Sequence, residues 1–190
     1  MSYNEDTIRK MLPKAYRRKH VAHEVSVALS FFKSLVPVMD EYVYNDGTKK
    51  KLMCLTGTVP IVYSDKTYNI PICLWIEDNY PQTAPFCFVR PTRDMMILKG
   101  KYISNNGEIL LPYLEEWRNE CDLVSLLQVM VAMFGEFPPV CKLPPSELEQ
   151  ASCQLQFQRE ADILTELDGK LYLSLNRESE SSFQQDETNC

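Results

Sequence analysis

Hydrophobic residues recur at helical spacing between Val21 and Leu35, and this pattern predicts an amphipathic helix lying on a core. The apolar positions of this stripe are Val21, Val25, Ala28, Phe32 and Leu35. Pro37 would end the helix, because proline has no backbone N–H and clashes with the preceding turn. A shorter helix is expected before it, around Thr7 to Leu12.

Four strand-like runs follow. The first two flank Asn45-Asp46-Gly47, whose positive-φ residues suit a tight hairpin turn. A second hairpin is predicted around residues 63–67. The third run alternates, with Ile70, Ile72, Leu74 and Ile76 on one face, and Pro71 indicates a sheet edge or a bulge. PFCFVRP is the fourth run.

The rest of the domain alternates irregular and helical segments. Residues 92–101 are predicted to be irregular, and residues 111–117 to hold a short helical turn. Asp122 is a good N-cap for a largely buried helix through LVSLLQVMVAMF, which Gly135 would end. Pro138-Pro139 would then stop regular structure. This order predicts an α+β fold, a four-stranded antiparallel meander with helices packed on one face.

The composition changes near residue 142. Residues 142–175 are interpreted as a linker with a helix around 147–167, since Ser146 and Glu149 form a capping box. Residues 176–190 are polar and acidic and are expected to be a disordered tail.

The charge and the cysteine content argue against several classes of function. A net charge of -6 without a basic stripe argues against nucleic-acid binding. The basic cluster from Lys14 to His20 has two readings, a solvated helix start or a weak contact with acidic lipid headgroups. Neither a membrane-spanning run nor a signal peptide is evident, so a cytoplasmic location is expected. The seven irregularly spaced cysteines indicate free thiols, with Cys73 and Cys87 in the core, rather than a metal site.

Residues 1–141 resemble the ubiquitin-conjugating-enzyme variant (UEV) domain, and most closely the UEV domains of the tumour-susceptibility subunit of ESCRT-I and its paralogues. The likeness is carried by LTGTVPIVYSDKTYNIPICLWIEDNYP, FCFVRPT, ILLPYLEEW and QVMVAMFGEFPPV. It implies a ubiquitin-conjugating-enzyme-like fold.

The resemblance also implies that the chain is not an enzyme. Conjugating enzymes need a nucleophilic cysteine just after an Asn-Gly turn, and Leu110 stands there, where no thioester can form. Tyr102-Ile103-Ser104 replace the His-Pro-Asn tripeptide, so the oxyanion-stabilising asparagine is not evident. Cys121 has no neighbouring base and is better read as a loop thiol. No catalytic residue, cofactor or metal is expected.

Two binding surfaces follow from the resemblance. The positions matching the ubiquitin-binding surface are Val43, Asn45 and Asp46 on the first hairpin, with Trp75 and Phe88 on the sheet. Turn chemistry for Asn45 and Asp46, and core packing for Trp75 and Phe88, are the competing interpretations. The positions matching a groove for Pro-(Thr/Ser)-Ala-Pro peptides are Thr58, Tyr63, Tyr68, Asn69, Pro71, Thr92, Met95, Pro139, Val140 and Cys141.

Cys141 and Lys142 depart from the family, which has an aromatic residue and a serine there. Losing that ring would cost about 1–3 kcal/mol of peptide affinity. The predicted function is a non-catalytic module that recognises ubiquitinated cargo and proline-rich motifs in endosomal sorting, in the cytoplasm and peripherally on endosomes. ESCRT-I subunits are further implied partners, although the chain ends before the coiled coil that would assemble them. The alternative is a UEV cofactor of an active conjugating enzyme in chain assembly.

Overall fold

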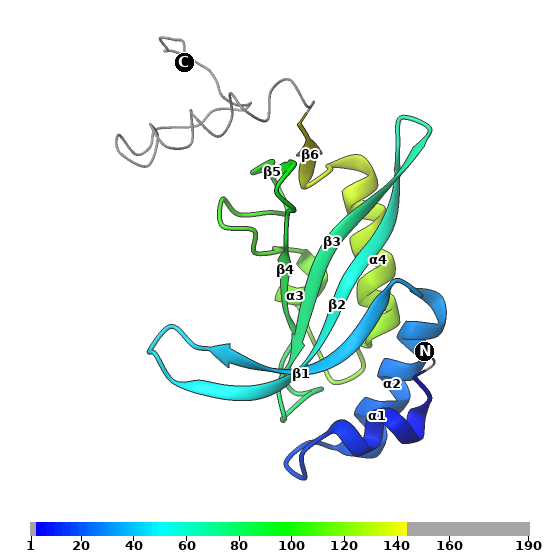
Figure 1. The fold of residues 1–190 in the computed structure, drawn as a ribbon, viewed down its shortest axis with the longest axis vertical. Coiled ribbons are helices and arrows are strands. Elements are labelled where there is room, and N and C mark those ends of the chain that lie inside the picture. The colour runs from blue at the N-terminus through cyan, green and yellow to red at the C-terminus, as the bar shows by residue number, and fades with distance from the viewer. Residues whose placement is uncertain (1–2, 144–190) are drawn as a thin grey trace. The chain divides into compact units, whose positions relative to one another are not determined.

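A computed structural model describes residues 3–143, which form two compact units (Figure 1). The first unit comprises residues 3–90 and 107–137, and the second comprises residues 91–106 and 138–143 of the described chain. The helix predicted around 147–167 and the tail predicted at 176–190 lie outside the described residues.

The first unit is built on a four-stranded antiparallel sheet, as the sequence predicts. Its strands are β1 (Leu35–Val43), β2 (Lys49–Tyr63), β3 (Lys66–Ile76) and β4 (Phe86–Val89), in the order β1-β2-β3-β4. The first turn closes with Gly47 at φ 90°, and the second with Ser64 and Asp65 at φ 52° and 64°. These positive φ angles match the right-handed twist of the flanking strands.

Two long helices lie against one face of this sheet (Figure 1). They are α2 (Arg18–Phe31) and α4 (Leu123–Glu136), with the shorter α1 (Glu5–Met11) packed on α2. The short α3 (Pro112–Glu115) confirms the predicted turn. No helix within residues 3–143 is long and apolar enough to cross a membrane.

The predicted end of the first long helix is wrong. The helix α2 ends at Phe31, and Leu35 and Pro37 belong to β1. The reason lies in β2, where Gly57 has φ +143° and a Cβ there would stand 2.0 Å from the Ser34 carbonyl oxygen. Because Gly57 has no side chain, the backbone at Ser34 can pass close to it. The chain therefore leaves α2 and enters β1 at Leu35, which is buried and pairs with Gly57.

The predicted start of α4 is confirmed, whereas its end and its burial are not. The Asp122 side chain caps the helix by accepting from the Ser125 N–H at 2.7 Å. Gly135 lies inside the last turn, where a Cβ would come 3.1 Å from the Val62 carbonyl oxygen. The helix buries one stripe, and Gln128 and Ala132 on another side are exposed.

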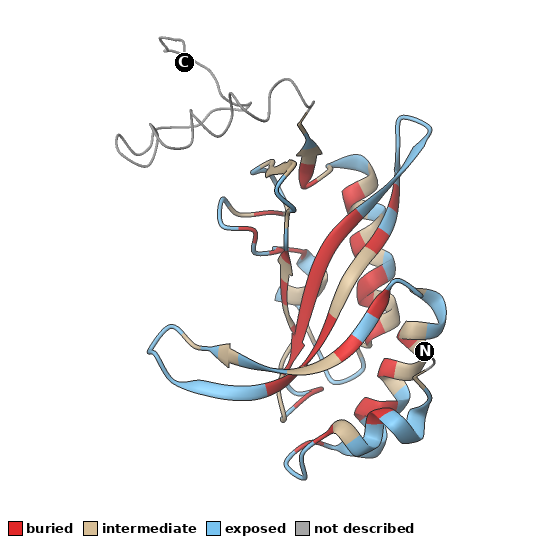
Figure 2. Cartoon of the chain, viewed as in Figure 1, coloured by how far each residue is buried: buried red, intermediate tan, exposed pale blue. Residues whose placement is uncertain are grey.

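Both faces of the sheet carry buried apolar residues. The buried positions along the strands are red in Figure 2. The alternating residues Ile70, Ile72, Leu74 and Ile76 lie on one face, as predicted, and all four are buried. The other face carries a second cluster of Leu52, Cys54, Cys73 and Trp75, with Val38, Tyr42, Phe86 and Phe88 packed against it. Pro71 is paired with Thr58 inside the central strand β3, so it does not lie on an edge strand as one of the two sequence interpretations expected. It stands one residue beyond the last β3–β4 pair, Ile72 with Val89, and its carbonyl accepts from the Arg90 N–H.

The second unit contains a two-stranded sheet that the sequence did not predict. The strands are β5 (Met95–Ile97) and β6 (Val140–Lys142), paired antiparallel. Residues 92–101 are therefore not wholly irregular, and Pro138-Pro139 does not end regular structure. The strands have three residues each and form only as a pair distant in sequence, so neither shows a periodic pattern of its own.

Candidate functional site

The end of the β1–β2 hairpin, residues 41–51, extends beyond the rest of the sheet and is named the tongue here (Figure 1). Val43 is 55% exposed, and Asn45 and Asp46 are exposed beside it. The Asp46 carboxylate accepts from the backbone N–H of Thr48 at 2.9 Å and from its hydroxyl at 2.7 Å. These bonds lower the pKa of Asp46, so this side chain holds the turn while its charge remains in solvent.

An aromatic cluster lies at the base of the tongue. The Tyr42 ring stacks on Phe86 with centroids 5.1 Å apart, and Trp75 is 5.2 Å from Tyr42. Tyr44 meets Tyr42 edge-on at 5.0 Å, and its hydroxyl donates to Glu77 Oε2 at 2.7 Å. Burial and this bond to Glu77 raise the pKa of Tyr44. The rings therefore join β1, β3 and β4 at the base of the tongue.

The register brings Trp75 and Phe88 to the same sheet face, because Trp75 pairs with Phe86 and Cys73 with Phe88. Trp75 is only 7% exposed. This burial fits core packing, which was one of the two interpretations of Trp75 from the sequence. Phe88 is half-buried, and the Arg90 guanidinium stands 5.4 Å from its ring centroid. Val43 follows Tyr42 in β1, so its side chain points to the opposite face of the sheet.

A thiol pair beneath this face was not anticipated as a unit. Cys54 and Cys73 are both buried in the second cluster, and Arg90 Nε donates to the Cys73 sulfur at 3.2 Å. The Cys54 thiol and Arg90 both stabilise a Cys73 thiolate, so the pKa of Cys73 is lowered and that of Cys54 is raised. The strand register creates this pairing, and no local sequence pattern indicates it.

Leu110 lies between two core residues but is itself 37% exposed, whereas Ile109 is 3% and Leu111 is 0% exposed. Its side chain offers no nucleophile. The Cys121 sulfur accepts from the backbone N–H of Arg118 at 3.3 Å, which fits the loop-thiol interpretation. No group of His, Cys, Asp and Glu within residues 3–143 is arranged to hold a metal ion.

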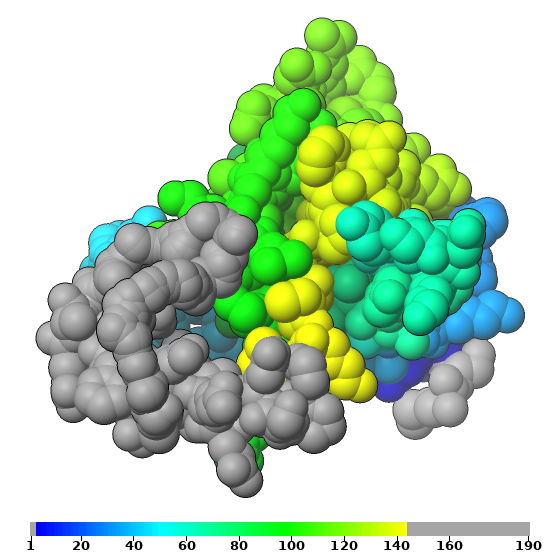
Figure 3. Space-filling model, turned by 90° about the horizontal axis from the view of Figure 1, so that it is seen from above, coloured from blue at the N-terminus to red at the C-terminus, as the bar shows by residue number. Residues whose placement is uncertain are grey.

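The residues predicted to bind peptide are divided between the two units. In the first unit, Tyr63 and Tyr68 are each 43% exposed near the end of the β2–β3 hairpin, whose tip is the teal surface in Figure 3. The register makes them diagonal neighbours on the helix-facing side of the sheet, because Ile61 pairs with Tyr68. By the same alternation, the opposite face of the sheet carries the side chains of Thr58, Asn69 and Pro71. Asn69 is exposed, Thr58 is half-buried and Pro71 is buried.

In the second unit, β5 and β6 bring their predicted residues together. Met95 pairs with Lys142, and Cys141 with Met96. Pro139 and Val140 are buried, and the Pro139 carbonyl accepts from the Leu98 N–H at 2.7 Å. The Thr92 hydroxyl donates to Asp94, whose carboxylate is 3.7 Å from Lys142 Nζ.

The family model of the UEV domain matches residues 7–142. The chain belongs to the UEV domain family. The human Tumor susceptibility gene 101 protein is 47% identical over 147 residues, which cover 77% of this chain and 38% of that protein. Ubiquitin-conjugating enzyme E2 variant 3 of Xenopus tropicalis is 38% identical over 144 residues, or 75% of this chain and 30% of that protein. The chain therefore spans less than half of the length of these relatives.

Two solved structures share the fold. The yeast vps23 UEV domain in complex with a vps27 PSDP peptide superposes with a TM-score of 0.62 at 24% identity, covering 71% of this chain and 92% of that one. The complex of the Vps23 UEV with ubiquitin gives a TM-score of 0.55 at 24% identity, covering 71% and 94%. These values establish the UEV fold for this chain.

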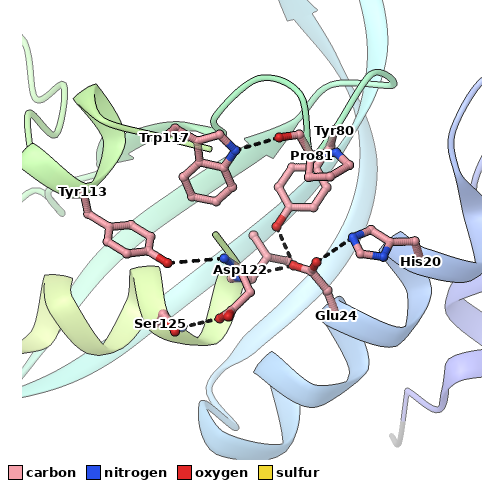
Figure 4. A network of polar contacts seen from close by, with 9 residues as sticks. His20, Glu24, Tyr80, Pro81, Tyr113, Trp117, Asp122 and Ser125 are labelled. Carbon is pink, nitrogen blue, oxygen red and sulfur yellow. Dashed lines mark hydrogen bonds and ion pairs between the residues drawn. The ribbon is translucent and has the colours of Figure 1, made fainter. Parts of the chain in front are cut away.

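A polar network inside this UEV domain joins α2, α4 and the Tyr-Pro loop, as Figure 4 shows. The hydroxyl of the fully buried Tyr80 donates to Glu24 Oε1 at 2.5 Å, and the Leu123 N–H donates to the same oxygen at 3.2 Å. His20 Nε2 lies 2.7 Å from Glu24 Oε2. Burial and the bond to Glu24 raise the pKa of Tyr80, so its hydroxyl stays protonated as a donor. Sequence reasoning missed this network because its members are far apart along the chain.

Proposed function

We propose that this UEV domain binds ubiquitin without catalysing its transfer. The surface would consist of the tongue and of the sheet face at its base, all within the first unit. Val43, Asn45 and Asp46 supply exposed apolar, amide and carboxylate groups within four residues of the tongue. The observation that carries the proposal is the tongue itself, a long exposed hairpin fixed at its base by stacked aromatic rings.

The chemistry of the surface supports this proposal. The half-buried rings of Tyr42, Phe86 and Phe88 offer apolar area, and Arg90 over Phe88 and Lys50 opposite Tyr42 place charge around it. An apolar centre with a polar rim is the usual composition of a protein interface and suits the hydrophobic patch of ubiquitin. Trp75 acts here by supporting these rings from below. The Vps23 UEV, which shares the fold, forms a complex with ubiquitin.

Leu110 supports the non-catalytic part of the proposal. An exposed aliphatic side chain at the expected nucleophile position cannot accept ubiquitin as a thioester. Bound ubiquitin would therefore be held and released unchanged, which is the action of a receptor for ubiquitinated cargo. A relative in Dictyostelium discoideum, 33% identical over 84 residues that cover 44% of this chain and 18% of that protein, is named ESCRT-I complex subunit tsg101. Endosomal sorting is accordingly the proposed setting.

Peptide binding extends the proposal. Tyr63 and Tyr68 present exposed rings, and flat rings pack well on proline, whose extended PPII conformation is already formed before binding. The yeast vps23 UEV domain forms a complex with a PSDP peptide. Cys141 replaces the aromatic residue of the family, so a lower affinity is proposed for this chain than for relatives that keep the ring.

Calorimetric titration with ubiquitin tests the proposal on three variants. Asn45→Ala removes an exposed amide, and Asp46→Asn removes a charge while keeping an oxygen that can accept from Thr48. Each is expected to weaken binding by about three-fold to ten-fold, the effect of one interface hydrogen bond. Asn105→Ala, an exposed asparagine in the second unit, is the matched control and should change nothing. Equal effects of all three variants would refute the tongue as the site.

A further inference from the structure

An open depression lies between the start of α1 and the start of α2, about 550 Å³ in volume, and its lining is strongly basic. The residues that line it are Glu5, Arg17, Arg18, Lys19, His20 and His23. The loop before α2 and the first turn of α2 are largely exposed, drawn pale blue in Figure 2. Neither the tongue nor the peptide residues involve this surface.

The cations of the depression are not used by the fold. Within residues 3–143, the side chains of Arg17, Arg18 and Lys19 make no ion pair or hydrogen bond. The acid in the lining, Glu5, is instead 3.2 Å from His23 Nδ1, and His20 is held by Glu24. Arg17, Arg18 and Lys19 are thus three consecutive exposed positive charges with no partner in the described part of the chain, and Lys14 is exposed in the same loop.

These charges also have the wrong sign for helix stability. The first turn of α2 has no acidic residue and no side-chain cap, and Arg18 and Lys19 occupy positions where a negative charge would be stabilising. A local arrangement that costs stability without a compensating contact points to a function outside folding.

The loop that carries the charges is held in place. Tyr16 is buried, and its hydroxyl donates to the Ile76 carbonyl at 2.6 Å and accepts from the Met53 N–H at 3.0 Å. The neighbouring cations thus project from a fixed backbone. The acidic excess of the sequence comes from the residues after 143, which include ten of its 26 acidic but only three of its 20 basic residues, so residues 1–143 carry 16 acidic and 17 basic side chains.

We propose that this depression docks the protein on a membrane surface rich in anionic phospholipid headgroups. Charge complementarity selects the phosphate-bearing surface, and the open shape suits headgroups projecting from a bilayer better than an enclosed soluble ligand. Each basic residue near such a surface strengthens binding about five-fold. Three to four of them give weak attachment that weakens further as the salt concentration rises.

Sedimentation of the full chain with vesicles tests the proposal. Vesicles of phosphatidylcholine with phosphatidylserine should bind the protein at low salt and release it as salt rises, and phosphatidylcholine alone should not bind it. The double variant Arg18→Glu, Lys19→Glu should lower the partition coefficient by more than about ten-fold. Its melting temperature should be no lower than that of the wild type, since acids suit the helix start. Its ubiquitin affinity should be unchanged.

A charge-matched control separates the patch from net charge. Lys33→Glu with Lys99→Glu changes the total charge equally at two exposed lysines elsewhere and should leave vesicle binding intact. An equal loss in both double variants, or binding to neutral vesicles, would overturn the proposal. Release from vesicles by inositol hexakisphosphate at an equal phosphate concentration would overturn the membrane as the occupant, since a soluble anion would then suffice.

Discussion

Tyr16 shows how a single residue joins three segments of the sequence. It stands in the loop between α1 and α2, yet its hydroxyl bonds the backbone of β2 and the end of β3. Burial raises the pKa of this hydroxyl to about 12. The sequence gives no hint of this role, because a tyrosine in a polar loop is equally suited to solvent exposure.

Replacement of Tyr16 by phenylalanine should lower the free energy of unfolding by about 2–3 kcal/mol. The variant keeps the ring but leaves the Ile76 carbonyl and the Met53 N–H buried without a partner. Urea denaturation at neutral pH measures the loss. Tyr63→Phe, at an exposed ring, serves as the control and should change stability by less than about 0.5 kcal/mol.

The raised pKa of Tyr16 also predicts an alkaline loss of stability. Below pH 10 the folded and unfolded states both hold the proton, and the full contribution is present. Between pH 10 and about 12 the unfolded state releases the proton first, so stability falls as pH rises. Unfolding free energies across this range should fall less steeply for Tyr16→Phe than for the wild type. Parallel curves would mean that Tyr16 titrates normally in the folded protein.

Gly57 is required by a close backbone approach. Gly57→Ala would force a Cβ to within 2.0 Å of the Ser34 carbonyl oxygen at a strained φ of +143°. The unfolding free energy should fall by about 2 kcal/mol or more, measured by thermal or urea denaturation. Gly47→Ala is a useful comparison, because a Cβ at position 47 would have no atom within 4 Å and only the positive φ opposes the change. A smaller effect at position 57 than at position 47 would contradict the crowding argument.

At the scale of elements, the features that depend on neighbouring residues, namely turns and helix caps, could be predicted from the sequence. Asn45-Asp46-Gly47 predicted the tongue, and Asp122 predicted the start of α4, because turn and cap residues act within three positions. The end of α2 was mispredicted because Gly57, in a distant strand, determines where the chain can turn. The pair β5–β6 was missed because each strand has three residues and its partner lies more than 40 positions away.

The same distinction holds for the candidate site. The turn that exposes the tongue residues could be predicted from the sequence, and their role in binding stays a prediction of the family resemblance. The buried position of Trp75 and its contact with Tyr42 required the strand register. The Cys54–Cys73–Arg90 group and the Glu24–Tyr80 network depend on residues that only the folded chain brings together.

At the scale of the whole molecule, the departure at Cys141 should limit peptide affinity. Cys141→Phe restores the ring of the family and should tighten binding of a Pro-Thr-Ala-Pro peptide by about one to two decades, measured by fluorescence anisotropy. Cys141→Ala removes the thiol without adding a ring and should leave the affinity unchanged. Equal affinities for the wild type and Cys141→Phe would contradict the role proposed for this position.

The whole chain should also lack transfer activity. Incubation with ubiquitin, activating enzyme and ATP should give no thiol-reducible adduct, because Leu110 has no heteroatom at the expected position. An active conjugating enzyme in the same mixture provides the positive control. A reducible adduct on the chain would contradict the proposed non-catalytic role, and its loss in Cys121→Ser would identify the thiol responsible.

The central claim is that the tongue and its adjoining sheet face hold ubiquitin. An NMR titration of the ¹⁵N-labelled full chain with unlabelled ubiquitin tests it most directly, because each backbone amide reports its own surroundings. Chemical-shift changes are predicted to concentrate between residues 41 and 51 and around Phe86 to Phe88. Spectra that remain unchanged at saturating ubiquitin, or changes that leave the tongue unaffected, would contradict the account.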